Sequence, residues 1–275
     1  MIKLKLIRGA GMLLAALLAI NEASIADAES IVLDGLIEPY LIVKIGSPTA
    51  GILETVKVDR GDMVTAGQVL ATLQSGVEKA TMELARARAG MESAIKARES
   101  KLNYMVREQK RMEQLHDQAL VSFEALDESR TNSSLARLDL EEAKENQQLA
   151  EFELKRSTEV VNRMTIYSPI TGVVTNRFLT AGEYVENQPI LQLAQINPLN
   201  VEVFAPVSLL GAIKVGMIAD VAPEKPVGGV YRARVTIVDR VMDAASGTFG
   251  VRLDLPNPRE KLPAGLKCKV TFRAM

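Results

Sequence analysis

Few residues of this 275-residue chain could carry out covalent or metal chemistry. There is one histidine, His116, and one cysteine, Cys268, so His-based triads and metal sites with several His or Cys ligands lack the residues they need. Eleven methionines could suit copper or silver, but most fall in helical or strand patterns, where core packing explains them. The sequence therefore predicts no catalytic residue, no metal site and no cofactor.

The composition also argues against nucleic acid as a partner. Lys and Arg almost balance Asp and Glu, leaving a formal net charge of -1, and aromatic residues make up only 4% of the chain. Nucleic-acid binding needs a concentrated basic surface, and single-stranded targets also need aromatic platforms. No run of basic residues follows the N-terminal region, so we expect partners of another kind.

The most specific local pattern is a spaced set of three residues in the segment RMEQLHDQALVS. Leu115 follows Arg111 by four positions, and Ser122 follows Leu115 by seven. One interpretation is ordinary: a solvated arginine, a leucine between two helices and a serine that caps a helix. The other interpretation is a contact site, and choosing between them requires the elements on which the three residues lie.

These residues interrupt a long helical pattern that covers residues 76–162. The segment has no proline and is rich in strong helix formers. Apolar and small residues recur at multiples of seven, in the first arm at Leu84, Met91, Met105 and Met112 with Ala80, Ala87, Ala94 and Leu115, and in the second at Leu126, Leu140, Leu154 and Val161 with Ala136, Ala143 and Ala150. This repeat predicts an antiparallel coiled-coil hairpin with arms of about 40 residues and a tip near residues 119–122.

The hairpin separates two copies of an internal repeat, residues 45–70 and 166–191. At a constant offset of 121 positions, Ser47, Pro48, Gly51, Gly61, Val64 and Leu70 match Ser168, Pro169, Gly172, Gly182, Val185 and Leu191. Both copies alternate apolar and polar residues, as half-buried strands do. Each copy resembles one half of a biotinyl/lipoyl domain, with Gly61 and Gly182 in tight turns.

The sequence after the second repeat predicts short strands separated by Gly- and Pro-containing turns, which favours a small antiparallel barrel. Residues 31–38 are expected to add one strand to it. The predicted fold is thus mostly β with a long helical hairpin, in an elongated and modular arrangement. The expected domains are a β-barrel (29–44 and 196–275), a split lipoyl-like domain (45–75 and 163–195) and the coiled-coil hairpin (76–162).

The N-terminus has the features of a secretory signal peptide, residues 1–28. Three basic residues precede an apolar stretch at residues 9–20, and Ala26-Asp27-Ala28 fits a cleavage site. The alternative is an uncleaved membrane anchor. Either interpretation predicts export, and we expect the protein in the periplasm, associated with the inner membrane.

A lipoyl-like domain split by a coiled-coil hairpin resembles the HlyD-like family of membrane fusion proteins, and the barrel segments resemble its resistance-nodulation-division (RND) branch. The resemblance implies a non-enzymatic periplasmic adaptor that links an RND-type inner-membrane pump to a TolC-like outer-membrane channel. It further implies a homo-oligomeric ring, a hexamer in this family. Arg111, Leu115 and Ser122 match the spacing with which the family's hairpin tip contacts the channel.

Three alternatives differ from this interpretation. An adaptor of an ABC-type exporter or of a type I secretion system would share the architecture. A biotin or lipoate carrier would need a modified lysine between the two halves, where the sequence has Thr72-Leu73-Gln74-Ser75. A coiled-coil scaffold without a transport role would not need the Arg-Leu-Ser spacing. The last expected strand ends close to Met275, so we expect no fourth, membrane-proximal domain.

Overall fold

The computed structural model describes residues 31–273, which divide into two compact units. The barrel unit contains residues 31–36, 202–253 and 267–273, and the hairpin unit contains residues 37–201 and 254–266. The expected signal peptide, residues 1–28, lies outside the described residues. Between residues 31 and 273, no helix is long and apolar enough to cross a membrane.

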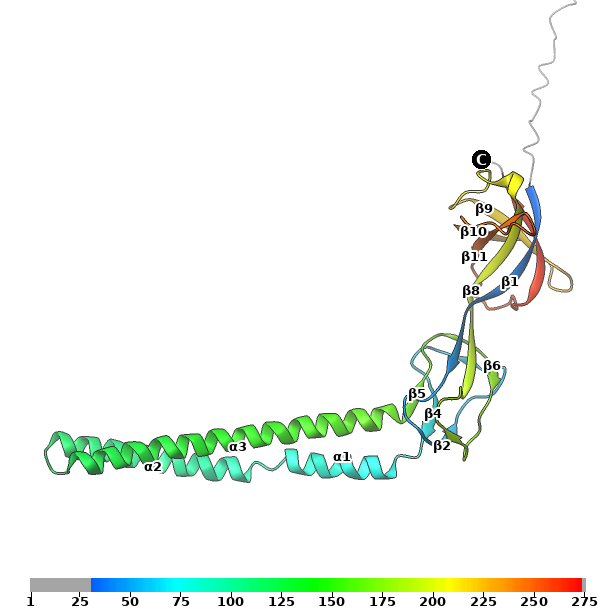
Figure 1. Cartoon of the computed structure of the whole chain (residues 1–275). Coiled ribbons are helices and arrows are strands. Elements are labelled where there is room, and N and C mark those ends of the chain that lie inside the picture. Colours follow the sequence, from blue (N-terminus) through cyan, green and yellow to red (C-terminus); the bar gives the residue numbers. More distant parts are fainter. Residues whose placement is uncertain (1–30, 274–275) are drawn as a thin grey trace, which may run out of the picture. The chain divides into compact units, whose positions relative to one another are not determined.

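Three helices of the hairpin unit form a long antiparallel hairpin (Figure 1). Two of them follow one another along one side, and both pack against the third, which has 41 residues. In chain order they are α1 (Gly76–Ala89), α2 (Ser93–Asp117) and α3 (Phe123–Arg163). The predicted fold of a β protein with a long helical hairpin is confirmed.

The seam of α3 follows the predicted heptad spacing but contains more serine than expected. Its buried residues are Leu126, Ser129, Ser133, Ala136, Leu140 and Ser157. The sequence predicted the apolar members but not the serines. Ser129 Oγ donates to the Leu126 carbonyl oxygen at 2.7 Å, so a bond within its own helix satisfies the buried hydroxyl. These small side chains allow the two arms to pack closely.

The first arm is interrupted at residues 90–92, which the prediction of a single continuous arm missed. As a result, Leu84 and Met91 do not lie in the seam: their side chains are 54% and 63% exposed, while Ala85 is buried. Met105 and Met112 lie partly buried as predicted. Counting back from Met105 in steps of seven leads to Met91 and Leu84. The interruption shifts the helical phase by one residue, so Ala85 is buried in place of Leu84. Ala80, Ala87 and Ala94 are also exposed, contrary to the prediction.

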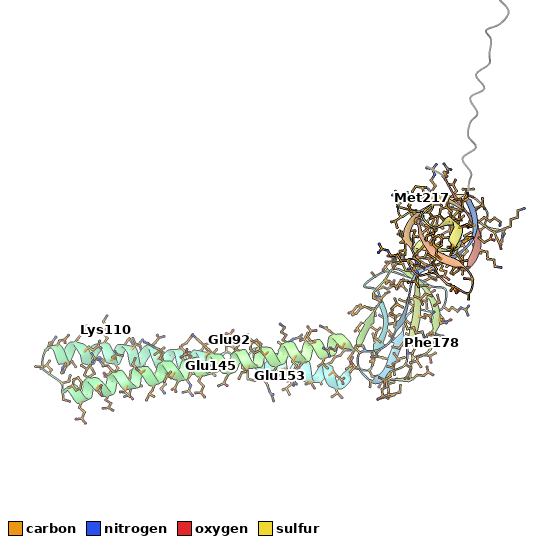
Figure 2. The ribbon with its side chains drawn as sticks, turned by 45° about the horizontal axis from the view of Figure 1, so that its top comes forward. Glu92, Lys110, Glu145, Glu153, Phe178 and Met217 are labelled. Carbon is orange, nitrogen blue, oxygen red and sulfur yellow. The ribbon has the colours of Figure 1, made fainter. Side chains whose placement is uncertain are left out.

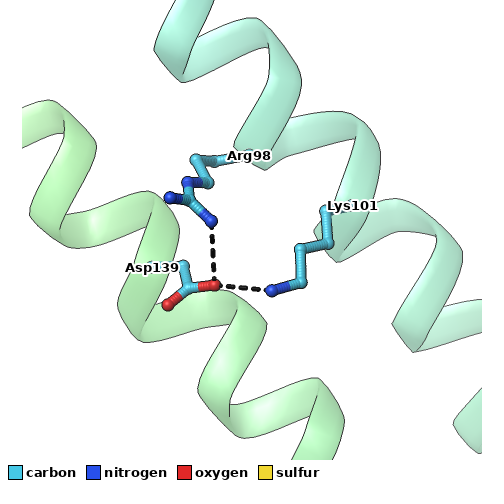
Figure 3. Close-up of polar contacts among 3 residues, drawn as sticks. All are labelled: Arg98, Lys101 and Asp139. Atoms are coloured by element: carbon cyan, nitrogen blue, oxygen red, sulfur yellow. Dashed lines mark hydrogen bonds and ion pairs between the residues drawn. The ribbon is translucent and has the colours of Figure 1, made fainter.

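Polar contacts between the arms fix how they are aligned. Asp139 of α3 lies between two cations of α2, at 3.3 Å from Arg98 and 2.8 Å from Lys101 (Figure 3). The hydrogen bond from Lys101 lowers the pKa of Asp139. Where the first arm is interrupted, Gln147 Nε2 donates to the Ala89 carbonyl oxygen at 3.4 Å. Exposed pairs of this kind add little stability, but they favour one alignment of the two arms over others.

The two repeat halves form six short strands, and strands of one half pair with strands of the other. The strands are β2 (Gly51–Val56), β3 (Met63–Val64), β4 (Val69–Leu73), β5 (Thr165–Tyr167), β6 (Gly172–Arg177) and β7 (Tyr184–Val185). β2 pairs with β7, β3 with β6, and β4 with β5. The predicted halves therefore build one domain, although about ninety residues separate them.

The pairing is reciprocal at the level of single residues. Gly51 pairs with Val185, and the equivalent positions 121 residues away, Gly172 and Val64, also pair. The Gly61 amide donates to the Val174 carbonyl, and the equivalent Gly182 amide donates to the Leu53 carbonyl. Both turn glycines have positive φ, 97° and 90°, as expected for tight turns. The sequence repeat thus corresponds to a two-fold symmetry of the domain.

The remaining strands close a barrel in the order β1-β12-β9-β10-β11-β8, with β1 also paired to β8. They are β1 (Ile31–Ile45), β8 (Leu191–Pro206), β9 (Ile218–Pro223), β10 (Tyr231–Val238), β11 (Thr248–Leu255) and β12 (Leu266–Phe272), with a one-turn helix, η1 (Val207–Leu209), after β8. Alternate residues point inward, such as Val251, Val270 and Phe272. The ranges of β1 and β8 run through both units, because each strand continues from one into the other.

The two symmetry-related glycines Gly51 and Gly172 give a test of the packing. A Cβ on Gly172 would lie 2.2 Å from the Ala194 carbonyl oxygen, a backbone atom, whereas one on Gly51 would meet only the end of the Leu73 side chain, at 2.8 Å. We expect Gly172→Ala to lower the free energy of unfolding by about 3 kcal/mol and Gly51→Ala by about 1 kcal/mol, because side chains adjust more easily than backbone. Urea unfolding followed by circular dichroism measures both, and equal losses would contradict this packing.

Candidate functional site

The three residues predicted to form a contact site lie together at one end of the hairpin. Arg111 and Leu115 lie in the last two turns of α2, and Ser122 is the N-cap of α3 after the loop of residues 118–121. Figure 2 labels the neighbouring Lys110, which marks this end of the hairpin. The structure therefore brings the three together through a tight helix-loop-helix connection, which we call the tip (residues 108–125).

Arg111 presents its charge to solvent. Its side chain is 64% exposed and forms an ion pair with Glu108, one turn earlier on the same helix, at 3.2 Å. Such exposed pairs contribute less than about 1 kcal/mol, so a partner could replace Glu108 at little cost. The guanidinium is thus available for charge-assisted hydrogen bonds to an incoming carbonyl or carboxylate.

The loop that follows Leu115 is held in one conformation by backbone bonds. The Leu120 amide donates to the Leu115 carbonyl at 2.9 Å, and the Ala119 amide donates to the His116 carbonyl at 2.8 Å. Ala119 adopts positive φ, 59°, the left-handed geometry that commonly ends a helix. The Ser122 hydroxyl then accepts the Ala125 amide at 3.2 Å and starts α3. Ser122 therefore acts as a cap, as the sequence predicts, whatever else it contacts.

The sequence analysis missed two residues of the tip, Leu120 and Phe123. Their side chains are 66% and 65% exposed, which is unusual for residues of this size. The His116 ring lies 6.3 Å from the Phe123 ring in an edge-on arrangement, and its Nδ1 lies 3.2 Å from the Val121 carbonyl oxygen. His116 thus lies against Phe123. The signal was present in the sequence, since a leucine lies within the predicted turn and a phenylalanine directly follows it.

Chemistry at other places in the described chain is limited. Within residues 31–273, no three His, Cys, Asp or Glu side chains are grouped so as to hold a metal ion. Cys268 points into the barrel, and burial, with smaller effects of Asp34 and Glu224, raises the pKa of its thiol to about 11. A thiol with this pKa stays protonated at neutral pH and is a poor nucleophile. The geometry favours the tip as the functional site.

Comparison with protein families identifies the architecture. Residues 41–195 match the model of the CzcB-like barrel-sandwich hybrid domain, which covers the split domain together with its hairpin. The chain belongs to this family of membrane fusion proteins. A second model, the CusB-like β-barrel domain, matches residues 199–275. The family is not enzymatic, which agrees with the prediction made from the resemblance.

Solved structures show the same fold at low sequence identity. MacA from Actinobacillus actinomycetemcomitans is 21% identical with a TM-score of 0.75, over 90% of this membrane fusion protein and 78% of that chain. The membrane fusion protein Spr0693 from Streptococcus pneumoniae R6 is 15% identical with a TM-score of 0.61, over 89% and 99% of the two chains. A putative efflux transporter from Bacteroides eggerthii is also 15% identical, with a TM-score of 0.55, over 89% and 69%.

An uncharacterized protein of Haemophilus influenzae is 21% identical over 234 residues. The match covers 84% of this membrane fusion protein but only 54% of the relative, so the chain spans about half the length of that relative.

The cap at Ser122 can be separated from any contact role. We expect Ser122→Ala to lower the free energy of unfolding by about 1 kcal/mol, because it leaves an amide at the start of α3 without its acceptor. Ser122→Asp keeps an acceptor at the cap and should retain the stability of the wild type. Thermal unfolding of the three proteins tests this, and a fully stable Ser122→Ala variant would contradict the cap.

Proposed function

We propose that this membrane fusion protein is a periplasmic adaptor of an efflux system, which joins an inner-membrane pump to an outer-membrane channel through the hairpin tip. The observation that carries the proposal is the tip itself. It places an exposed cation, Arg111, beside the two exposed apolar side chains of Leu120 and Phe123, on a rigid helical support. Arginine and aromatic residues at the centre of a contact commonly supply most of its binding energy.

The channel side of the proposal assigns a role to each residue of the spaced set. Arg111 donates charge-assisted hydrogen bonds to the end of a TolC-like channel. Leu115, partly buried between the arms, supports the loop and supplies apolar surface to the same contact. Ser122 holds the start of α3, so that Phe123 projects from a fixed backbone.

The pump side of the proposal rests on the barrel. The family model that matches residues 199–275 is a CusB-like barrel of the RND group, which favours an RND-type pump over an ABC-type exporter. We place the protein in the periplasm at the inner membrane, exported by the signal that residues 1–28 are expected to form.

A homo-oligomeric ring fits the outer surface of α3. Among the large apolar side chains exposed on this helix, four form two pairs fourteen residues apart, Leu135 with Leu138 and Leu149 with Phe152. The spacing puts them on one stripe directed away from α1 and α2. An apolar stripe of this length favours lateral packing of hairpins from neighbouring copies.

The tip proposal is tested by recovering the outer-membrane channel with tagged adaptor from solubilised envelopes. We expect Arg111→Asp and, separately, Phe123→Ser to reduce recovery at least about tenfold, the change produced by losing roughly 1.4 kcal/mol of binding free energy. Arg88→Asp, a charge reversal of an exposed residue of α1 far from the tip, should have no effect. Normal recovery and normal export with Arg111→Asp would refute the assignment.

A further inference from the structure

One outer face of the barrel carries a concentration of cations that the adaptor role does not explain. Strand alternation directs Ala233, Val235, Cys268 and Val270 into the barrel, and therefore directs the intervening residues outward. The outward residues of β10 and β12 include four cations, and a fifth follows β12: Arg232, Arg234, Lys267, Lys269 and Arg273. We call these five residues, with the outer face of β9 between them, the basic wall.

The register of the strands places the two rows of cations on either side of β9, staggered along it. β10 and β12 both pair with β9, on opposite sides of it. Asp220 of β9 faces Arg232 on one neighbouring strand and Thr271 on the other. Neighbouring strands lie about 4.8 Å apart, and outward residues on one strand follow every 6.8 Å or so. The basic wall is therefore one continuous surface, although its residues come from segments more than thirty positions apart.

Three carboxylates balance part of this charge. Asp220 binds Arg273, and Asp34 of the neighbouring strand β1 binds Lys269 at 2.8 Å. Among residues 31–273, Arg232, Arg234 and Lys267 have no carboxylate oxygen within 4.0 Å. Glu224, directly after β9, lies opposite Lys267 and interacts electrostatically with Lys269, so the excess of cations over these three carboxylates is two positive charges.

The charge is segregated between the two units. The described part of the barrel unit contains nine Lys and Arg against six Asp and Glu, a net charge of +3. The described part of the hairpin unit contains 21 Lys and Arg against 25 Asp and Glu, a net charge of -4. The chain as a whole is nearly neutral, but its barrel unit is positive, and the basic wall carries two of the three excess charges of that unit.

The shape of the surface indicates what kind of anion it suits. The basic wall is the outer surface of a sheet, and a cavity of about 440 Å³ in the barrel unit is lined by other residues, among them Phe204 and Asp239. Charge spread over the outer surface of a sheet suits an anion that is also spread out, rather than one small bound ion. Exposed apolar side chains, Val32 and Leu36 of β1 and Ile218 of β9, lie on the same outer face.

We propose that the basic wall binds the anionic headgroups of a phospholipid bilayer and so holds the barrel against the membrane surface. Dispersed cations attract such a surface by roughly equal increments, and the neighbouring apolar side chains can enter the interface between headgroups. The proposal does not depend on docking of the tip to a channel, because the two surfaces belong to different units of the protein.

The test is co-sedimentation of the full-length protein with vesicles of phosphatidylcholine, with and without about 30% phosphatidylglycerol. At low salt we expect at least tenfold stronger binding to the anionic vesicles, and its loss at about 0.3 M salt as the charges are screened. The double variant Arg232→Glu/Arg234→Glu should reduce this binding at least tenfold, since each cation near an anionic surface contributes about a fivefold factor. Soluble glycerol phosphate should compete poorly, because the bilayer presents many charges at once.

The matched control is Arg88→Glu/Arg137→Glu, which changes the net charge by the same amount on the hairpin. It should bind anionic vesicles like the wild type, and both double variants should keep the wild-type unfolding midpoint. Equal binding to neutral and anionic vesicles would overturn the proposal, because apolar insertion, for example by residues 9–20, would then explain it. Loss of self-association in the wall variant, with unchanged vesicle binding, would also overturn it and assign the wall to a protein contact.

Discussion

The whole hairpin unit depends on the reciprocal pairing of two half-domains that lie 121 residues apart. Neither half can complete its own sheet, because β2, β3 and β4 of the first half pair with β7, β6 and β5 of the second. The helical segment inserted between the halves must therefore begin and end at neighbouring positions in the domain. The Leu73 amide donates to the Met164 carbonyl at 2.8 Å, and Thr72 pairs with Thr165, so the two ends of the insertion are held one strand apart.

This closure turns a helical insertion into a rod with a defined tip. Two arms that start and finish side by side must be antiparallel and nearly equal in length, so the turn falls at the far end. The small side chains in the seam, including Ser133 and Ala136, keep the arms close. Asp139, between Arg98 and Lys101, aligns them. The same constraint places the residues proposed to contact a channel at the tip. The hairpin therefore holds contact residues at a fixed distance from the domain and does not form a catalytic pocket.

The barrel differs from the hairpin unit in the charge of its outer surface. Its interior is apolar and closed, and its only cysteine is protected by burial. Its outer face carries an excess of cations, whereas the hairpin unit has an excess of carboxylates. A division of charge between two units allows each to favour a different kind of surface, while the chain as a whole stays near neutrality.

The sequence by itself determined the fold class, the hairpin, the two half-domains and the alternating strands, because these depend on periodicity over a few residues and on a direct repeat. It also placed Arg111, Leu115 and Ser122 at one tip, since a short turn keeps near neighbours together. Only the tertiary structure decided the shift of helical phase at residues 90–92, which exposes Leu84. That shift depends on how α1 and α2 each pack on α3, which no local pattern records. The basic wall was also hidden in the sequence, because it arises from the register of strands whose residues are distant along the chain.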